Sequence, residues 1–304
     1  MTITLDGQVA LVTGAGTGLG RAHALALAER GARVVVNDID AGPAAGSPGA
    51  GVVAEIEAAG GQAVLERCDV ADADAVESMV ARTVEAWGRV DILINNAGIL
   101  RDKSFAKSDL ADFRQVVDVH LMGSVHCSRA VWPHMVERGY GRILMTTSAS
   151  GIYGNFGQAN YGAAKAAVVG LMNVLAIEGR TRGIRVNALA PTAATRMTED
   201  LLEPDELARL APETVSPGAV FLVSPDAPTK TILAAGAGVF AVARMEESRG
   251  LHLPADRRTP EDIAAQWERI SDMTESVVTG SAFEQTRRYL DLVQRDAEPT
   301  AARS

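Results

Sequence analysis

The sequence predicts an α/β protein built on a doubly wound parallel sheet. Short apolar runs alternate with longer, Ala-rich stretches from residue 8 onward, and this alternation is typical of parallel strands that are joined by helices. A cluster of glycines directly follows the first apolar run, where a strand would turn into a helix. We therefore expect one sheet-forming domain over residues 1–240 and a C-terminal extension over residues 241–304.

The expected strands are continuous apolar runs, because parallel strands are buried on both faces. They cover residues 9–13, 33–37, 63–68, 90–95, 142–147 and 185–190, with a weaker candidate at 232–235. The expected helices cover about residues 19–30, 51–59, 72–87, 109–138 and 159–182. These helices are long enough to form the right-handed crossovers that parallel strands require.

Other segments lack this alternation. Residues 42–51 (GPAAGSPGAG) are interpreted as a surface loop after the second strand. Beyond residue 238 the alternation stops, but Thr259 can cap a helix near residues 260–273, and Pro260 suits its first position. Residues 297–304 are expected to be disordered.

Composition narrows the class of protein. The 304 residues include 29 Lys and Arg against 38 Asp and Glu, and the resulting net charge of −9 makes nucleic acid an unfavourable partner. The N-terminus does not resemble a signal peptide, and no apolar stretch reaches the ~18 residues of a membrane span, so we expect a soluble, cytoplasmic protein. Cys68 and Cys127 are too few for a disulfide framework and lack metal-ligand spacing, so we expect reduced packing residues and no metal site.

The glycine cluster TGAGTGLG at residues 13–20 predicts a phosphate-binding turn. Glycine lets the backbone approach a pyrophosphate, and the N-terminus of the following helix supplies free N–H groups and a positive dipole. Any tight turn might use glycines, but the strand-to-helix context favours a nucleotide. The candidate cofactor residues in this turn are Gly14, Thr17, Gly18, Leu19 and Gly20.

Asp38 ends the second expected strand. A carboxylate in this place can accept hydrogen bonds from ribose hydroxyls and repels the extra phosphate of NADP, so NAD is the expected cofactor. The alternative is that Asp38 only begins a turn. Further candidate cofactor residues, each of which could equally belong to an ordinary turn, are Asp69, Val70, Asn96, Ala97 and Gly98.

Ser148, Tyr161 and Lys165 are the candidate catalytic residues. Tyr161 and Lys165 are four residues apart in an expected helix, so their side chains share one face. A nearby ammonium would lower the pKa of the tyrosine, which could then exchange a proton with an alcohol or a ketone. Ser148 would hold the substrate oxygen, and Lys165 could also bind the nicotinamide ribose. A surface lysine beside a packed tyrosine is the alternative.

These motifs, with Tyr161 and Lys165 in YGAAK, resemble the short-chain dehydrogenase/reductase family over about residues 5–240. The resemblance implies a Rossmann-type sheet, tyrosine-based hydride-transfer chemistry with Tyr161 and Lys165 also touching the cofactor, and a homodimer or homotetramer. A narrower resemblance lies in NNAGILRDKSF at 95–105, SASGIYGNFGQANYGAAK at 148–165 and APTAATRMT at 190–198. These segments, and TPEDIAAQWERISDM at 259–273, are similar to the (3R)-hydroxyacyl-CoA dehydrogenase domain of peroxisomal multifunctional enzymes of type 2, also called 17β-hydroxysteroid dehydrogenase type 4.

The sequence departs from the wider family in two places. His120 stands where the family usually has a catalytic asparagine, and it either preserves the role of that asparagine or simply packs. The family's Pro-Gly pair is Pro191-Thr192 here, so the resemblance implies cofactor contacts from Pro191 and Thr195. The usual Asp-Gly-Gly near the end of the domain is replaced by Gly-Ala-Gly at 236–238.

The sequence therefore predicts an NAD-dependent enzyme that oxidises a secondary alcohol, with (3R)-3-hydroxyacyl-CoA as the first choice of substrate. Free hydroxysteroids are an alternative, because the motifs specify the reacting carbinol and little else. A catalytically silent nucleotide-binding protein is a third possibility, which the intact Ser, Tyr and Lys set disfavours. Arg101, Lys103 and Arg196 follow expected strands and are either contacts for the phosphates of coenzyme A or a solvated surface cluster.

Overall fold

The computed structural model describes residues 2–39, 46–193 and 208–297. The chain divides into two compact units, Met1–Ala243 and Arg244–Ser304. The first unit contains all the candidate site residues of the sequence analysis.

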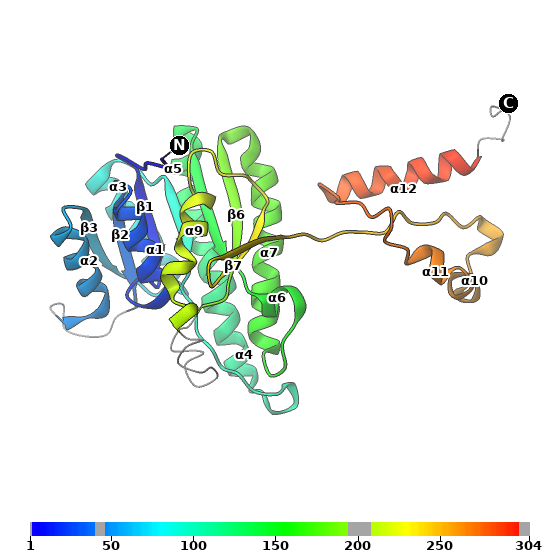
Figure 1. Cartoon of the computed structure of the whole chain (residues 1–304), viewed down its shortest axis with the longest axis horizontal. Coiled ribbons are helices and arrows are strands. Elements are labelled where there is room, and N and C mark those ends of the chain that lie inside the picture. The colour runs from blue at the N-terminus through cyan, green and yellow to red at the C-terminus, as the bar shows by residue number, and fades with distance from the viewer. Residues whose placement is uncertain (1, 40–45, 194–207, 298–304) are drawn as a thin grey trace. The chain divides into compact units, whose positions relative to one another are not determined.

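Among the described residues of the first unit, eight strands form one sheet in the order β3-β2-β1-β4-β5-β6-β7-β8 (Figure 1). Neighbouring strands are parallel, except that β8 is antiparallel to β7. The strands are β1 (Val9–Thr13), β2 (Arg33–Asp38), β3 (Gln62–Arg67), β4 (Ile92–Asn95), β5 (Gly141–Thr146), β6 (Ile184–Pro191), β7 (Ile232–Gly236) and β8 (Val239–Ala243). This is the predicted doubly wound sheet, and the predicted fold class is confirmed.

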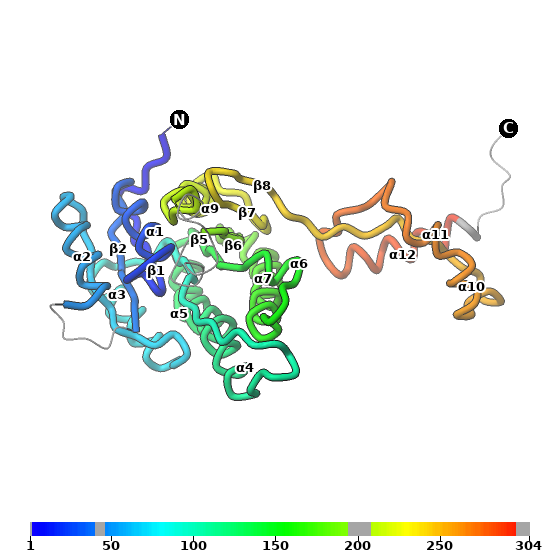
Figure 2. The backbone as a smooth tube through the Cα atoms, turned by 60° about the horizontal axis from the view of Figure 1, so that its bottom comes forward, coloured from blue at the N-terminus to red at the C-terminus, as the bar shows by residue number. Residues whose placement is uncertain are grey.

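Helices cover both faces of the sheet, and each face buries an apolar cluster (Figure 2). One face packs against α1 (Gly18–Ala28), α2 (Pro48–Ala58) and α9 (Ser216–Leu222). The other face packs against α3 (Ala73–Trp87), α5 (Gly123–Arg138) and α7 (Ala159–Gly179). Shorter segments are η2 (Phe105–Lys107), α4 (Leu110–Val117), α6 (Ala149–Tyr153), η4 (Arg180–Arg182) and η6 (Pro212–Thr214). Cys68 and Cys127 are free, buried thiols in the second cluster, as predicted.

The loop expected over residues 42–51 is shorter than predicted, because α2 begins at Pro48. The Ser47 hydroxyl accepts a hydrogen bond from the Ala50 N–H, and Pro48 occupies the first helical position. A serine cap followed by proline is a favoured way to start a helix. The expectation of irregular structure up to residue 51 is therefore wrong.

The sheet also has a strand that the sequence analysis did not predict. β8 pairs with β7 after a reversal in which Ala237 and Gly238 both have positive φ, 50° and 74°. Val239, Phe240 and Val242 are all exposed, so β8 lacks the buried pattern of the other strands.

The helix expected over residues 109–138 contains an irregularity. A π-helical turn, η3 (Asp118–Met122), separates α4 from α5. In a π turn the backbone bonds to the fifth residue along the chain, and such turns often occur at functional sites. His120 lies at the centre of this turn.

Among the described residues, one helical segment is long and apolar enough to cross a membrane by length and composition. It is Ala159–Arg182, so the expectation that no stretch of this size exists is wrong. Residues such as Val168, Met172 and Ala176 pack it against the sheet, as in the core helix of a globular fold.

The second unit contains η7 (Ala255–Arg257), α10 (Pro260–Ala265), α11 (Trp267–Ile270) and α12 (Ala282–Ala297). Thr259 and Asp262 form a reciprocal capping box at the start of α10, which confirms the predicted helix start. The helix predicted near 260–273 is split into α10 and α11, and α12 was not predicted. Of the segment 297–304, Ala297 ends α12 and the others lie outside the described residues.

Candidate active site

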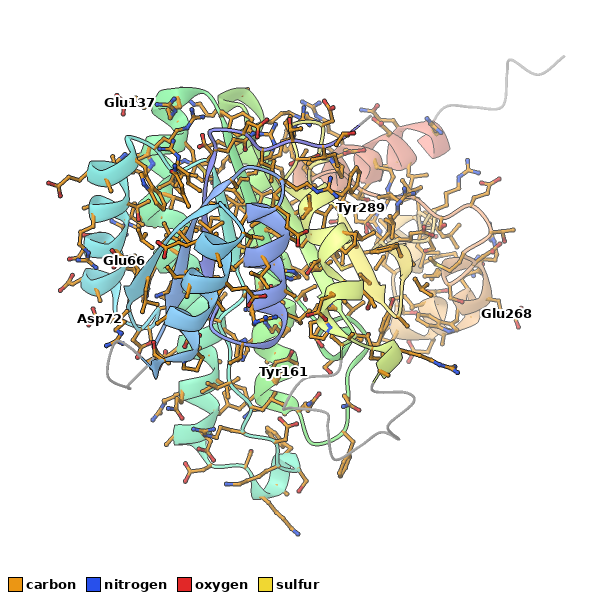
Figure 3. The ribbon with its side chains drawn as sticks, turned by 60° about the vertical axis from the view of Figure 1, so that its left-hand side comes forward. Glu66, Asp72, Glu137, Tyr161, Glu268 and Tyr289 are labelled. Carbon is orange, nitrogen blue, oxygen red and sulfur yellow. The ribbon has the colours of Figure 1, made fainter. Side chains whose placement is uncertain are left out.

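The candidate residues gather at the carboxyl ends of the parallel strands. β1 pairs with β2 on one side and β4 on the other, so the chain reverses its winding direction beside β1. Open α/β sheets bind ligands in the crevice at such a switch point. Figure 3 shows Tyr161 at the opposite end of the sheet from Glu137, which lies near the end of α5, just before β5 begins.

The glycine turn between β1 and α1 has the geometry of a phosphate cradle. Gly14 and Gly18 have positive φ values of 62° and 54°, which other residues rarely adopt. A Cβ on Gly14 would lie 2.9 Å from the Ala97 Cα, and one on Gly20 would overlap the Gly14 carbonyl. The backbone segments therefore pack closely where α1 begins, with no room for side chains at Gly14 and Gly20. The dipole of α1 favours an anion at this end of the helix.

Asp38 lies at the end of β2 beside this turn. Its Oδ2 atom accepts a hydrogen bond of 2.8 Å from the Gly16 N–H. This bond fixes one carboxylate oxygen beside the turn. The residues of the turn and Asp38 thus fit the pyrophosphate and ribose of a dinucleotide.

The loop after β4 is bonded to the glycine turn. The Thr13 hydroxyl accepts hydrogen bonds from the N–H groups of Asn96 and Ala97, at 2.9 and 3.0 Å. The Asn96 amide group donates to the carbonyls of Thr13 and Gly14. Asn96 therefore shapes the turn through its side chain.

The other candidate cofactor residues lie along the same edge. Asp69 closes a turn by accepting from the Ala71 N–H, and Val70 is buried against Gly123. Pro191 ends β6. Thr195 and the Arg196 named above lie outside the described residues.

Ser148 and Tyr161 face each other across the end of β5. Ser148 lies two residues beyond β5 and caps α6, where its Oγ atom accepts from the Ser150 N–H at 3.1 Å. Tyr161, in the first turn of α7, lies near enough to Ser148 for its hydroxyl to affect the pKa of Tyr161. Burial raises the pKa of Tyr161, the Ser148 hydroxyl lowers it, and the negative charge of Asp102 raises it.

Lys165 is on the same helix and is 3% exposed. Its Nζ atom lies 5.6 Å from the centre of the Tyr161 ring and donates to the Thr146 carbonyl at 2.6 Å. Burial lowers the pKa of Lys165 to about 7. The expectation that this ammonium lowers the pKa of Tyr161 is therefore wrong for the structure as it stands. Burial favours the neutral form of Lys165, and burial is also the largest influence on the pKa of Tyr161, which it raises.

His120 packs beneath this group, in edge-to-face contact with the Tyr161 ring at 5.2 Å between ring centres. Its Nε2 atom lies 2.8 Å from the Ile99 carbonyl oxygen and 3.1 Å from the Ile99 nitrogen. Because one ring nitrogen cannot donate and accept at once, each tautomer satisfies only one of these contacts. Its Nδ1 atom is buried without a partner, and burial together with the charge of Lys165 lowers the pKa of His120 to about 3.

The cationic residues of the loop after β4 are paired. The Asp112 carboxylate lies 3.1 Å from Lys103 Nζ and 3.7 Å from Arg101 Nε. Asp102 and Gln158 were not predicted as site residues, yet Gln158 Nε2 donates to Asp102 Oδ2 at 2.6 Å, three residues before Tyr161. Within the described part of the chain, no cluster of three metal-binding side chains occurs.

Comparison with known proteins agrees with this site. The model of the short chain dehydrogenase family matches residues 8–206. Mouse peroxisomal multifunctional enzyme type 2 is 44% identical over 300 residues, which cover 96% of this chain and 40% of that protein. The structure of full-length peroxisomal multifunctional enzyme type 2 from Drosophila melanogaster matches with a TM-score of 0.81 and 37% identity, over 96% of this chain and 50% of that one.

A third match is the structure of a 7α-hydroxysteroid dehydrogenase complexed with NADH and 7-oxo glycochenodeoxycholic acid. Its TM-score is 0.70 and its identity 34%, over 77% of this chain and 95% of that one. This chain thus spans half or less of the two multifunctional enzymes and most of the hydroxysteroid dehydrogenase.

The fold and the site define an oxidoreductase that uses a nicotinamide dinucleotide. The chain belongs to the short-chain dehydrogenase family. Within that family its similarity to the peroxisomal multifunctional enzymes of type 2 extends over nearly the whole chain, which confirms the narrower resemblance.

Proposed function

We propose that this protein is an NAD-dependent dehydrogenase that converts (3R)-3-hydroxyacyl-CoA into 3-ketoacyl-CoA, in the degradation of fatty acids or sterol side chains. The observation that carries the proposal is the convergence of Ser148, Tyr161 and Lys165 at the same edge of the sheet as the glycine turn. The substrate rests on the similarity to peroxisomal multifunctional enzymes of type 2.

The proposed chemistry follows from the positions of the side chains. The Ser148 hydroxyl holds the oxygen of the substrate alcohol next to Tyr161, and the tyrosine oxygen takes the hydroxyl proton as the carbonyl forms. A nicotinamide cofactor held by the glycine turn and Asp38 would supply the acceptor for the hydride of the carbinol carbon. Lys165 lies close to the ring of Tyr161 and can bind the nicotinamide ribose.

The preference for NAD over NADP rests on Asp38. Its carboxylate is held beside the glycine turn by the Gly16 N–H, close to where the adenosine ribose of a dinucleotide lies in this kind of fold. A phosphate on that ribose would meet a negative charge, whereas ribose hydroxyls can donate to it.

Free hydroxysteroids remain the second candidate substrate. The hydroxysteroid dehydrogenase among the matches was solved with a 7-oxo steroid bound, so a related fold holds a free steroid. A silent nucleotide-binding protein is disfavoured, because the catalytic side chains are all present and bonded to one another or to the same strand ends.

The ion pairs of Arg101 and Lys103 give less support to the hypothesis that these residues contact the phosphates of coenzyme A. Arg101 and Lys103 share the carboxylate of Asp112 on α4, so their charges are partly compensated. The substrate proposal does not depend on them. A homodimer or homotetramer, a small-molecule substrate as the partner, and a cytoplasmic location remain predictions, and the mouse and fruit-fly relatives carry the word peroxisomal in their names.

The test is NADH production with 3-hydroxyacyl-CoA thioesters of both configurations and, in parallel, with free hydroxysteroids. We expect the (3R) thioesters to be oxidised with the highest kcat/KM. A far higher kcat/KM with a free hydroxysteroid would make the steroid the substrate. If no secondary alcohol gave NADH, the protein would only bind a nucleotide.

A further inference from the structure

A network of side chains joins the loop after β4 to the segment that carries Ser148 and Tyr161. Gln158, three residues before Tyr161, is its centre. Its Nε2 atom donates to Asp102 Oδ2 at 2.6 Å, and its Oε1 atom accepts from the Ser150 hydroxyl at 2.7 Å and from Asn155 Nδ2 at 3.1 Å. Both polar ends of Gln158 are therefore in use.

Ser150 extends the network to Ser148. Its backbone N–H donates to Ser148 Oγ, while its hydroxyl donates to Gln158. A continuous series of bonds thus runs from Asp102 through Gln158 and Ser150 to the Ser148 hydroxyl, which in turn lowers the pKa of Tyr161. Gly154 and Gly157 have positive φ in the connection between α6 and α7, so the backbone there reverses sharply.

Main-chain bonds hold the same two segments together. The Lys103 N–H donates to the Gly157 carbonyl at 2.9 Å, and Asn160 Nδ2 donates to the Arg101 carbonyl at 3.0 Å. The Asn160 Oδ1 atom also accepts from the Tyr161 N–H. Residues 101–103 therefore contact the start of α7 at three successive positions, of which Asp102 is the middle one.

We propose that Asp102 and Gln158 are positioning residues that hold the Ser148 hydroxyl and the Tyr161 ring in the geometry needed for proton transfer. This proposal rests on the proposed function, because it assigns Ser148 and Tyr161 to that proton transfer. Asp102 also places a negative charge near the Tyr161 oxygen, so it acts on the tyrosine both through the network and through space.

The other charged groups around Tyr161 do not cancel this charge. Lys165 on α7 donates to the Thr146 carbonyl, and His120 on η3 is a buried neutral ring. Ser148 is uncharged. The carboxylate of Asp112 pairs with Lys103 and is not among the groups that act on Tyr161. Asp102 is thus the acidic side chain, among the described residues, that raises the pKa of Tyr161.

The network makes two different substitutions at Asp102 informative. Asp102→Asn keeps an oxygen that can accept from Gln158 and removes the charge, whereas Asp102→Ala removes both. We expect Asp102→Asn to lower the pKa of Tyr161 and to move the acid limb of kcat/KM for alcohol oxidation to lower pH. Asp102→Ala and Gln158→Leu should in addition lower kcat by about 10-fold to 100-fold, because small misplacements of reacting groups are costly. The KM for NAD should change little.

The experiment measures the titration of Tyr161 as well as turnover. Ultraviolet difference titration of each protein against its Tyr161→Phe counterpart isolates the Tyr161 phenolate without any substrate. Asp112→Asn is the matched control, since it removes a nearby carboxylate, on α4, that pairs with Lys103. The proposal predicts a downward shift for Asp102→Asn and none for Asp112→Asn.

Equal titration curves for wild type and Asp102→Asn, or undiminished kcat in Gln158→Leu, would overturn the proposal. A general loss of structure would appear in the circular dichroism spectrum of Gln158→Leu. In that case the titration of Asp102→Asn, which keeps the hydrogen bond with Gln158, decides whether the proposal holds. If no secondary alcohol is oxidised by the wild type, the proposed function fails, but the titration still tests the network.

Discussion

Lys165 should destabilise the folded protein at neutral pH, and its replacement by methionine tests this. The side chain is 3% exposed and makes one hydrogen bond, to the Thr146 carbonyl. Burial lowers its pKa from 10.5 to about 7, because the ammonium loses hydration that this single bond does not replace. Methionine has a similar length and no charge, so Lys165→Met removes the burial penalty while it keeps most of the volume.

The sign and size of the effect follow from proton binding. Between pH 7 and pH 10.5 the unfolded chain keeps the lysine proton that the folded chain gives up, so wild-type stability rises with pH in this window. One proton corresponds to about 1.4 kcal/mol for each pH unit, and the whole pKa change corresponds to about 5 kcal/mol. Against this, Lys165→Met leaves the Thr146 carbonyl unpaired, at a cost of about 1–3 kcal/mol that does not depend on pH.

The assay is urea unfolding of wild type and Lys165→Met at several pH values across this window. We expect the wild type to gain stability relative to the variant by about 1.4 kcal/mol for each pH unit as the pH rises above 7. The same stability difference at every pH would show that Lys165 keeps an ordinary pKa in the folded protein, and it would refute the reasoning. The variant should also lose dehydrogenase activity, so stability and function oppose each other at this position.

Three further substitutions test other parts of the site. Tyr161→Phe should lower kcat by about 10²-fold to 10⁴-fold while NAD still binds in a fluorescence titration, and near-normal turnover would place the proton transfer elsewhere. We expect wild type to prefer NAD over NADP by roughly 10²-fold in kcat/KM, and Asp38→Ala should reduce this ratio. The reason is that the Asp38 carboxylate and the extra phosphate of NADP, if ~4 Å apart, repel by about 4 kcal/mol before screening. Equal kcat/KM with both cofactors in the wild type would contradict the role of Asp38. Gly98→Ala would place a Cβ against the buried His120 ring and should destabilise the fold by about 1–3 kcal/mol in urea unfolding. Gly170→Ala on α7 meets nothing within 4 Å and is its control, so equal stability of the two variants would count against the tight packing.

Most of the sheet could be predicted from sequence because parallel strands that are buried on both faces leave continuous apolar runs. β1 matches its predicted bounds, and β7 was recognised from four residues. β8 was missed although VFAVA is a continuous apolar run, because it follows β7 after a two-residue reversal and the alternation of strand and helix stops there. The start of α2 had a readable signal in Ser47 and Pro48, which the surrounding glycines obscured.

The site was predictable only where it depends on local spacing. Tyr161 and Lys165 share one face of their helix however that helix packs, because they are four residues apart. The glycine turn is recognisable because it directly follows a strand. The π turn at His120 has no periodic signature, and the bond between Asp102 and Gln158 joins loops 56 residues apart. The pKa of Lys165 depends on how completely the helix is buried, which spacing does not reveal.

The central claim is that the protein oxidises a (3R)-3-hydroxyacyl-CoA with NAD and that Tyr161 takes the proton of the substrate hydroxyl. The most direct measurement follows NADH formation from matched (3R) and (3S) thioesters with wild type and with Tyr161→Phe. The account predicts that wild type oxidises the (3R) thioester in strong preference to the (3S) form and that Tyr161→Phe nearly abolishes this reaction. Oxidation of the (3S) thioester alone, or equal rates in both proteins, would contradict it.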